Sequence, residues 1–162
     1  KNKINAYGVD ISLTDLNHAK KKYANIKDKF IHTKSLNDLK KKFKKKKFDV
    51  IIASQSLYYL SNKDMEELLY FLKKLMNKNG IIFASMISNK SSLFKNSEVF
   101  KYGLRKVYSK NKKDFHFMNF TKNVVSLKNR FKDFKEINSG YYSVCFDQKN
   151  DINHHYTFIG KK

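Results

Sequence analysis

The chain has 162 residues, a length that fits one domain, and 41% of them are hydrophobic, enough for an ordinary core. Lys and Arg number 35 against 14 Asp and Glu, a formal net charge of +21. The absence of Pro and the single cysteine, Cys145, exclude collagen-like chains, Pro-rich linkers, an internal disulfide and a cysteine-rich zinc site. No apolar run approaches the roughly 18 residues of a membrane span, and no signal peptide opens the chain. We therefore expect a reduced, cytoplasmic domain with no membrane partner.

The first half of the sequence predicts alternating strands and helices. Four short apolar stretches are strand candidates: residues 6–10, 30–33, 48–53 and 81–85. Two S-x-x-D sequences, at Ser12 and Ser61, have the form of capping boxes. They predict one helix over about residues 13–25 and a second that runs from Ser61 until Gly80 stops it. This strand–helix–strand order predicts a doubly wound α/β sheet with right-handed crossovers.

The lysine-rich run at residues 40–47 raises the question of a nucleic-acid partner. Only Arg105 and Arg130 are arginine, so 35 − 2 = 33 of the cations are lysine. Specific phosphate and base readout favours the planar arginine fork instead. The excess of Lys, Asn, Ile, Phe and Tyr is what an AT-rich coding sequence gives. We interpret the run as a solvated helix end or loop; the alternative is that it binds nucleic acid.

The second half is patterned differently. Residues 88–117 are basic, aromatic and weakly periodic, which favours a partly helical cap or a long connection, and Thr121 is a candidate N-cap for a helix after it. Two strands, 141–146 and 155–159, close the chain. The short polar link 147–153 between them is typical of a β-hairpin.

Asp10 stands where a predicted strand ends and a capped helix begins. In nucleotide-cofactor α/β folds a carboxylate at this point accepts hydrogen bonds from ribose hydroxyls, about 20 residues beyond a Gly-rich turn. Only nine residues precede Asp10. We therefore expect a fragment whose first strand, Gly-rich turn and first helix lie upstream. The simpler alternative is that Asp10 is merely an acid near a helix start.

Three stretches together resemble class I S-adenosylmethionine-dependent methyltransferases: YGVDIS at 7–12, FDVIIASQSLYYL at 48–60 and NGIIF at 79–83. The resemblance implies a Rossmann-like, doubly wound, mostly parallel sheet with a C-terminal antiparallel hairpin, its first strand and Gly-rich turn absent from this chain. It also implies one incomplete methyltransferase domain over residues 1–162. We expect such a piece alone to be poorly stable and inactive. A nicotinamide-dependent oxidoreductase is a further alternative, disfavoured by the closing hairpin.

The resemblance implies S-adenosylmethionine as cofactor and assigns residues to its adenosine part. Asp10 would hold the ribose hydroxyls, and Ile11 would pack on the adenine. Ser35 and Leu36 occupy a turn whose backbone contacts the adenine in the family, although Ser35 replaces the usual acid. The glycines of the phosphate-side turn stay unassigned, because no G-x-G-x-G occurs in the sequence.

Ser54 and Gln55 would lie beside the methionine part of the cofactor and the acceptor. A sulfonium is already a strong methyl donor, so the enzyme chiefly aligns a nucleophile about 3 Å from the methyl group. Acid–base residues are not obligatory, and the catalytic residues stay unassigned, with Gln55 and His116 as candidates. Tyr58 or Tyr59 is a candidate π face for the sulfonium, the alternative for each being simple packing.

The absence of two motifs from the sequence narrows the range of possible methyl acceptors. Amino methylases of nucleobases or glutamine carry an Asn/Asp-Pro-Pro-aromatic stretch where this chain has SQSL at 54–57. Pyrimidine-C5 enzymes use a loop cysteine, whereas Cys145 falls in a predicted strand. We predict methylation of an oxygen or nitrogen of a small molecule, with residues 88–119 as substrate cap; the alternative is a lysine-rich RNA-binding protein or RNA methyltransferase on the same fold. No metal site is expected, because His154 and His155 point to opposite faces of a strand.

Overall fold

The structure is a computed structural model and describes residues 4–109, 113–145 and 152–162. The chain divides into two compact units, Lys1–Lys45 and Lys46–Lys162. Each unit contains a sheet with helices beside it, so the predicted mixed α/β class is confirmed. No helix within the described residues combines the length and apolar character needed to cross a membrane.

The first unit contains two short parallel strands and two helices. Its elements are β1 (Gly8–Asp10), α1 (Leu13–Lys22), η1 (Ala24–Lys29), β2 (Phe30–His32) and α2 (Leu36–Phe43). The predicted cap of α1 is present, since the Ser12 hydroxyl accepts from the Asp15 backbone N–H at 3.2 Å. The predicted helix over 13–25 is too long, because Tyr23 leaves helical geometry (φ −122°, ψ 56°) and the chain continues as a 3-10 helix.

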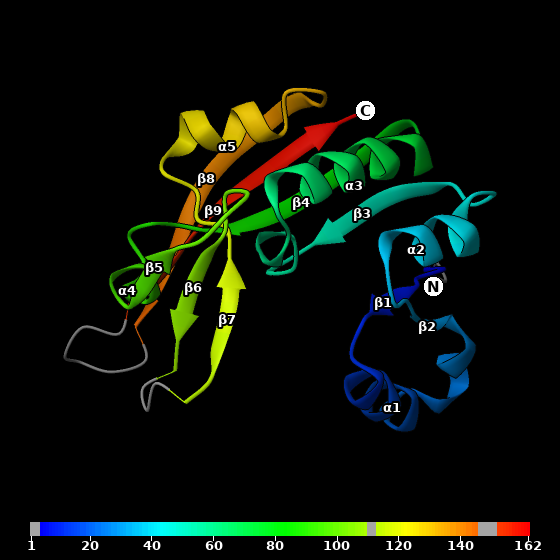
Figure 1. Cartoon of the computed structure of the whole chain (residues 1–162). Helices are drawn as coiled ribbons and strands as arrows, with labels where there is room; N and C mark the ends of the chain where they lie inside the picture. Colours follow the sequence, from blue (N-terminus) through cyan, green and yellow to red (C-terminus); the bar gives the residue numbers. More distant parts are fainter. Residues whose placement is uncertain (1–3, 110–112, 146–151) are drawn as a thin grey trace. The chain divides into compact units, whose positions relative to one another are not determined.

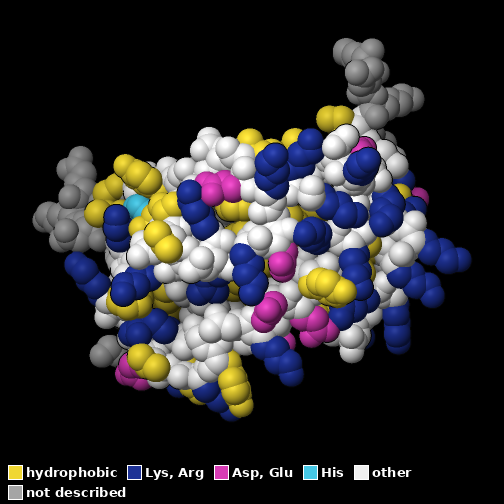
Figure 2. All heavy atoms as spheres, turned by 90° about the horizontal axis from the view of Figure 1, so that it is seen from above, with side chains coloured by type: hydrophobic (Ala, Val, Ile, Leu, Met, Phe, Trp, Pro, Cys, Tyr) yellow, Lys and Arg dark blue, Asp and Glu magenta, His cyan; other side chains and the backbone are white. Residues whose placement is uncertain are grey.

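The lysine-rich run begins in the last turn of α2, which holds Lys40, Lys41 and Lys42. Cations at this position interact favourably with the negative end of the helix dipole. The run therefore lies at a helix end and in the loop after it, as predicted. Figure 2 shows dark-blue Lys and Arg side chains spread widely over the face in view, with few acidic side chains among them.

The second unit is built around a four-stranded sheet in the order β3–β4–β9–β8. Its elements are β3 (Phe48–Ala53), η2 (Leu57–Tyr59), α3 (Asn62–Leu75), β4 (Met76–Ile87), α4 (Ser92–Lys95), β5 (Ser97–Val99), β6 (Arg105–Tyr108), β7 (Phe115–Met118), α5 (Val124–Arg130), β8 (Lys135–Cys145) and β9 (Ile152–Lys161). β3 and β4 are parallel, whereas β9 is antiparallel to both β4 and β8. The predicted closing pair of antiparallel strands is confirmed; most of its predicted polar link lies outside the described residues.

The helix that begins after Ser61 ends earlier than predicted. α3 stops at Leu75, and β4 starts at Met76, so Gly80 lies inside a strand and does not terminate the helix. Glycine is needed there for close packing: a Cβ on Gly80 would lie 3.1 Å from the carbonyl oxygen of Phe48. The S-x-x-D cap itself is correct, since the Ser61 hydroxyl accepts from the Asp64 backbone N–H at 3.1 Å.

Within residues 88–117 the described chain holds one helical turn and three short strands joined by irregular connections, so the expectation of a partly helical segment or long connection did not include these strands. β5, β6 and β7 make a separate antiparallel sheet, and α4 is a single turn (Figure 1). Thr121 does not cap the next helix: it is fully buried and forms a β-bridge with Ser88. Asn123 is the cap instead, because its side-chain oxygen accepts from the Ser126 backbone N–H at 2.8 Å.

A large part of the core of the second unit lies on one face of the four-stranded sheet, the face on which Figure 1 shows α3 and α5. Ile82 and Met86 of β4 are fully buried there, together with Met65 of α3. Phe131, just after α5, stacks on Phe158 of β9 with ring centroids 4.5 Å apart. The core thereby fixes the strand ends that position the candidate site.

Candidate functional site at the carboxyl ends of the strands

Four predicted cofactor residues share one edge of the first unit. β1 and β2 run parallel, with Asp10 opposite His32, so Asp10 and Ile11 leave the sheet at the same edge as the turn that holds Ser35 and Leu36. Carboxyl ends of parallel strands are where ligands bind in open α/β sheets. The topology therefore brings these four residues to one place within this unit.

The Asp10 carboxylate is exposed and held at one oxygen. Its Oδ1 accepts from the Ser12 backbone N–H at 2.8 Å, and within the described residues no hydrogen bond or ion pair engages Oδ2, which faces solvent. The Ile11 side chain is 76% exposed, and its carbonyl is 3.0 Å from Nε2 of His32. The result is a fixed carboxylate beside an exposed apolar side chain, the pair that a ribose and a purine ring require.

The Ser35 hydroxyl is already used by the protein. It accepts from the Asp38 backbone N–H at 3.2 Å and thereby caps α2, while the Leu36 side chain is half-buried. The nearest acid, Asp38, bonds Lys42 at 2.9 Å, and the side-chain hydrogen bond from Lys42 lowers the pKa of Asp38. Any contact from this turn to a ligand would come from its backbone.

Gln55 has a strained backbone at the carboxyl end of β3. Its φ of +52° lies in the left-handed region, which is uncommon for a residue other than glycine. Two hydrogen bonds hold it: its backbone N–H donates to Oγ of Ser85 at 2.8 Å, and its Nε2 donates to the hydroxyl of Tyr142 at 2.9 Å. Ser54, the residue before it, is exposed. Strain maintained by defined partners is typical of functional positions.

Tyr142 is itself held by a buried histidine. Its ring stacks on His155 with centroids 5.0 Å apart and planes 6° apart, and Nε2 of His155 lies 2.8 Å from Oδ1 of Asn153. Burial, followed by the charge of His154, lowers the pKa of His155. A neutral His155 that donates from Nε2 leaves Nδ1 as an acceptor, and within the described chain that buried atom has no partner.

Tyr58 and Tyr59 differ in exposure although their ring centroids are 4.6 Å apart. Tyr58 is 5% exposed, packs 5.7 Å from the His155 ring and belongs to the core. Burial, followed by a hydrogen bond with Tyr59, raises its pKa, so it stays a neutral phenol. Tyr59 is 48% exposed, so of the two tyrosines it is the one whose ring is accessible.

His116 is not brought to Gln55. It lies exposed in the outer strand β7 and pairs with Val107 of β6. Among the described residues no hydrogen bond or ring contact joins it to Gln55. Its candidacy as a catalytic base therefore has no support from the geometry.

Sequence reasoning missed the residues that hold Gln55. Ser85 could have been noticed, because it is a small polar residue at the end of the apolar run 81–84. In the structure it is fully buried. Nothing in the sequence pointed to Tyr142, because its contact with Gln55 depends on the register of strands 87 residues apart in the chain.

Metal-binding residues do not gather in the described part of the chain, where no group of three or more His, Cys, Asp or Glu has suitable geometry. His154 stacks on Tyr141, whereas His155 stacks on Tyr142, so the two imidazoles point to opposite faces of β9. Cys145 is exposed in β8.

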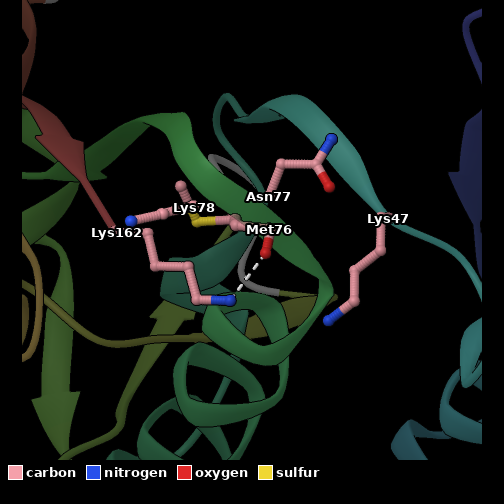
Figure 3. A pocket seen from close by; sticks show the side chains of 5 residues that line it. All are labelled: Lys47, Met76, Asn77, Lys78 and Lys162. Carbon is pink, nitrogen blue, oxygen red and sulfur yellow. Dashed lines mark hydrogen bonds between the residues drawn. The ribbon is translucent and has the colours of Figure 1, made fainter.

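A hollow of about 400 Å³ lies at the other end of β4 from Ser85 (Figure 3). Its lining is Lys47, Met76, Asn77, Lys78 and Lys162. The ammonium groups of Lys162 and Lys47 donate to the carbonyls of Met76 and Lys74, both at 2.6 Å. These two lysines satisfy backbone carbonyls at the end of α3. The residues that line the hollow therefore have a structural role.

The sequence comparisons identify the family. The family model described as "Methyltransferase domain" matches residues 1–82, half of the chain. The chain belongs to this family. The interpretation from the motifs at 7–12, 48–60 and 79–83 is thereby confirmed. An uncharacterized protein of Rickettsia prowazekii is 34% identical over 83 residues, which are 51% of this chain and 33% of that protein. The chain thus spans about a third of the length of this relative.

Solved structures of methyltransferases share the fold. An S-adenosylmethionine-dependent methyltransferase from Clostridium acetobutylicum is similar over 98% of this chain and 75% of its own, with a TM-score of 0.68 and 16% identity. One from Methanosarcina mazei is similar over 96% of this chain and 81% of its own, with a TM-score of 0.72 and 10% identity. At these identities the likeness establishes the fold, and the predicted Rossmann-like class is confirmed.

Proposed function

We propose that this chain is part of an enzyme that transfers a methyl group from S-adenosylmethionine to an oxygen or nitrogen of a small-molecule acceptor. The observation that carries the proposal is the methyltransferase match over residues 1–82, which includes the acid-ended strand β1 and the segment around Gln55. The similar structures named above are S-adenosylmethionine-dependent enzymes, which supports the same cofactor here.

Asp10 and Ile11 are the proposed contacts to the adenosine part of the cofactor. The open oxygen of the Asp10 carboxylate accepts hydrogen bonds from ribose hydroxyls, and its other oxygen is fixed by Ser12. The exposed Ile11 side chain packs on adenine. Ser35 and Leu36 contact the ring from their backbone, since the Ser35 hydroxyl caps α2. These residues supply binding and orientation, while the cofactor supplies the activated methyl group.

Gln55 is the proposed orienting residue for the acceptor. Its amide nitrogen is committed to Tyr142, so its Oε1 is left to accept a hydrogen bond from an O–H or N–H group. An amide is not a base, so Gln55 aligns the nucleophile and does not remove its proton. Alignment is the main requirement when the donor is a sulfonium. Ser54 flanks this position, and the β5–β7 segment within residues 88–119 is the proposed substrate cap.

The experiment measures transfer of tritiated methyl groups from labelled S-adenosylmethionine, by the enzyme of which this chain is part, to a cell extract that is then separated into small-molecule, protein and RNA fractions. We expect label in the small-molecule fraction and a loss of at least tenfold with Gln55→Ala, because a misaligned nucleophile loses most of the rate. The matched control is Asn77→Ala, which removes an amide that donates to Asp49 at 2.7 Å near the other end of β4 and should leave the rate unchanged. Label that appears only in RNA or protein would contradict the proposed acceptor class.

A further inference from the structure

One face of the β5–β7 sheet carries a row of aromatic side chains. Residues alternate between the faces of a strand, and Val107 of β6 and Met118 of β7 belong to the buried core of the unit. The opposite face therefore points away from that core. It carries Tyr108 from β6 and Phe115 and Phe117 from β7, with Tyr108 and Phe115 directly paired.

Phe100, which follows β5, extends this row. Its ring centroid lies 4.6 Å from that of Phe117; Phe117 lies 5.3 Å from Phe115, and Phe115 lies 6.4 Å from Tyr108. We call these four rings the aromatic row. Phe100 is 44% exposed and Phe115 is 43% exposed, so ring surface is accessible at two positions of the row.

Two lysines border the aromatic row. The ammonium nitrogen of Lys106 lies 4.1 Å from the centroid of Phe115 and 5.2 Å from that of Tyr108. The ammonium nitrogen of Lys101 lies 5.5 Å from the centroid of Phe100. Ammonium groups therefore lie over one face of three of the four rings, those of Phe100, Tyr108 and Phe115.

The charge around the row is positive. The described residues among 88–119 contain six Lys or Arg and two Asp or Glu, a difference of 6 − 2 = +4. The acid on this face, Glu98, accepts a hydrogen bond from the Tyr108 hydroxyl at 3.0 Å. The surface is therefore complementary to an anionic ligand with flat rings.

The small sheet is anchored, so the row is preformed. The turn between β5 and β6 has Tyr102 at φ +60° and Gly103 at φ +81°, and the Tyr102 carbonyl accepts from the Asn62 backbone N–H at 3.0 Å. Arg105 binds Ser97 twice, from Nε to the hydroxyl and from Nη2 to the carbonyl, both at 2.6 Å. These contacts join β5 to β6 and fix the turn to the start of α3.

We propose that the aromatic row binds unpaired bases of a single-stranded nucleic acid, with Lys101 and Lys106 contacting its phosphates. Bases offer flat π faces at a spacing that successive aromatic side chains can stack on, and the phosphates supply the matching negative charge. A double helix hides its base faces, so this surface selects single strands. The inference goes beyond the proposed function, because this binding needs neither cofactor nor methyl transfer.

The test is fluorescence anisotropy of a labelled RNA of about 12 nucleotides, without self-complementarity, titrated with the purified protein. DNA of the same sequence and the corresponding RNA duplex serve as competitors. The variant is Phe115→Leu, which keeps an apolar side chain and removes the ring. The matched control is Tyr70→Leu on α3, which also removes an exposed ring from beneath a lysine, since Lys74 lies 4.2 Å from the Tyr70 centroid.

We expect Phe115→Leu to weaken single-strand binding by about tenfold, Tyr70→Leu to leave it unchanged, and the duplex to compete poorly. The loss should persist as salt is raised, because stacking is not screened whereas lysine–phosphate contacts are. The proposal is overturned by absence of binding, by equal affinities of the two variants, or by preference for the duplex. It is also overturned if light scattering reveals a dimer that Phe115→Leu dissociates, since a second copy would then occupy the face.

Discussion

The two faces of the β3–β4–β9–β8 sheet differ in what covers them. On the face beneath α3 and α5, Ile82 and Met86 of β4 are fully buried. On the other face, which we call the open face, Val50 is 55% exposed and Ile52 is 70% exposed, although both belong to the apolar run of β3. The register confirms that Ile52 and its partner Phe83 lie on the face opposite to Ile82.

The open face changes character along its length. Toward the carboxyl ends of β3 and β4 it carries Ser85, His155 and Tyr142. Ser85 and Tyr142 each accept a hydrogen bond from Gln55. The face beneath the helices is therefore packed along the sheet. The open face is exposed at β3, joins the core at Ile87 near the end of β4, and there also supplies the polar groups of the candidate site. A residue's effect on stability should depend on its face more than on its type.

The largest expected contrast comes from one substitution made on both faces. Ile82→Thr removes a fully buried side chain and places a hydroxyl in the core, so we expect it to lower the free energy of unfolding by about 3 kcal/mol. Ile52→Thr, on the neighbouring strand, should cost less than about 0.5 kcal/mol, because the side chain is exposed and threonine keeps the β-branch. Urea unfolding of both variants measures the difference. Equal losses would mean that the open face is packed against another part of the protein in solution.

A second prediction concerns the histidines of β9. Burial lowers the pKa of both His154 and His155 in the folded chain below the ordinary value of 6.5, so the unfolded chain binds more protons near that pH. The free energy of unfolding therefore has its full value above pH 6.5. It falls as the pH drops below 6.5, by up to about 1.4 kcal/mol per pH unit for each histidine.

Urea unfolding between about pH 8 and pH 5.5 tests this dependence. His155→Phe keeps a ring to stack on Tyr142 and removes one titrating group, so the loss of stability below pH 6.5 should become smaller. The physical basis is wrong if the wild-type chain shows no loss, or if the variant shows the same loss.

The smallest expected effect comes from removing the hydrogen bond between Gln55 and Tyr142. Tyr142→Phe keeps the stack on His155 but removes the oxygen that accepts from the Gln55 amide, so it should cost about 1 kcal/mol or less of stability. The methyl-transfer rate should fall several-fold, because Gln55 loses its fixed orientation. Tyr141→Phe is the control, since Tyr141 faces the opposite side and is 70% exposed. If both variants keep the wild-type rate, Tyr142 does not position Gln55.

The parts of the fold that could be predicted from sequence are those encoded by a continuous apolar run or by hydrogen bonds between residues close together in the chain. The strand at 48–53 is correct to the residue because a continuous apolar run bounded by lysines and serines allows little else. The caps at Ser12 and Ser61 follow from hydrogen bonds within four residues. The β5–β7 sheet was missed because its two faces are both apolar: Val107 and Met118 face inward while Phe115 and Phe117 face outward, which hides the alternation.

The candidate site was predictable only where it borders a strand. Asp10 ends the first apolar run and Gln55 lies two residues beyond the third, so both lie at the carboxyl ends of strands in the structure. The partners that hold Gln55 come from strands 30 and 87 residues away, and their pairing depends on a register that no local pattern encodes. His116 was named because it stands between two phenylalanines, yet that pattern marks an exposed strand.

The central claim is that Asp10 of this chain binds an adenosyl cofactor, and calorimetric titration of the enzyme of which the chain is part with S-adenosylmethionine tests it directly. We expect binding that Asp10→Ala weakens by roughly 10- to 100-fold, since hydrogen bonds to a charged group are lost. Asp28→Ala, which removes an exposed acid of η1, should bind as the wild type does. Equal affinities of the two variants, or heat only with a nicotinamide dinucleotide, would contradict the account.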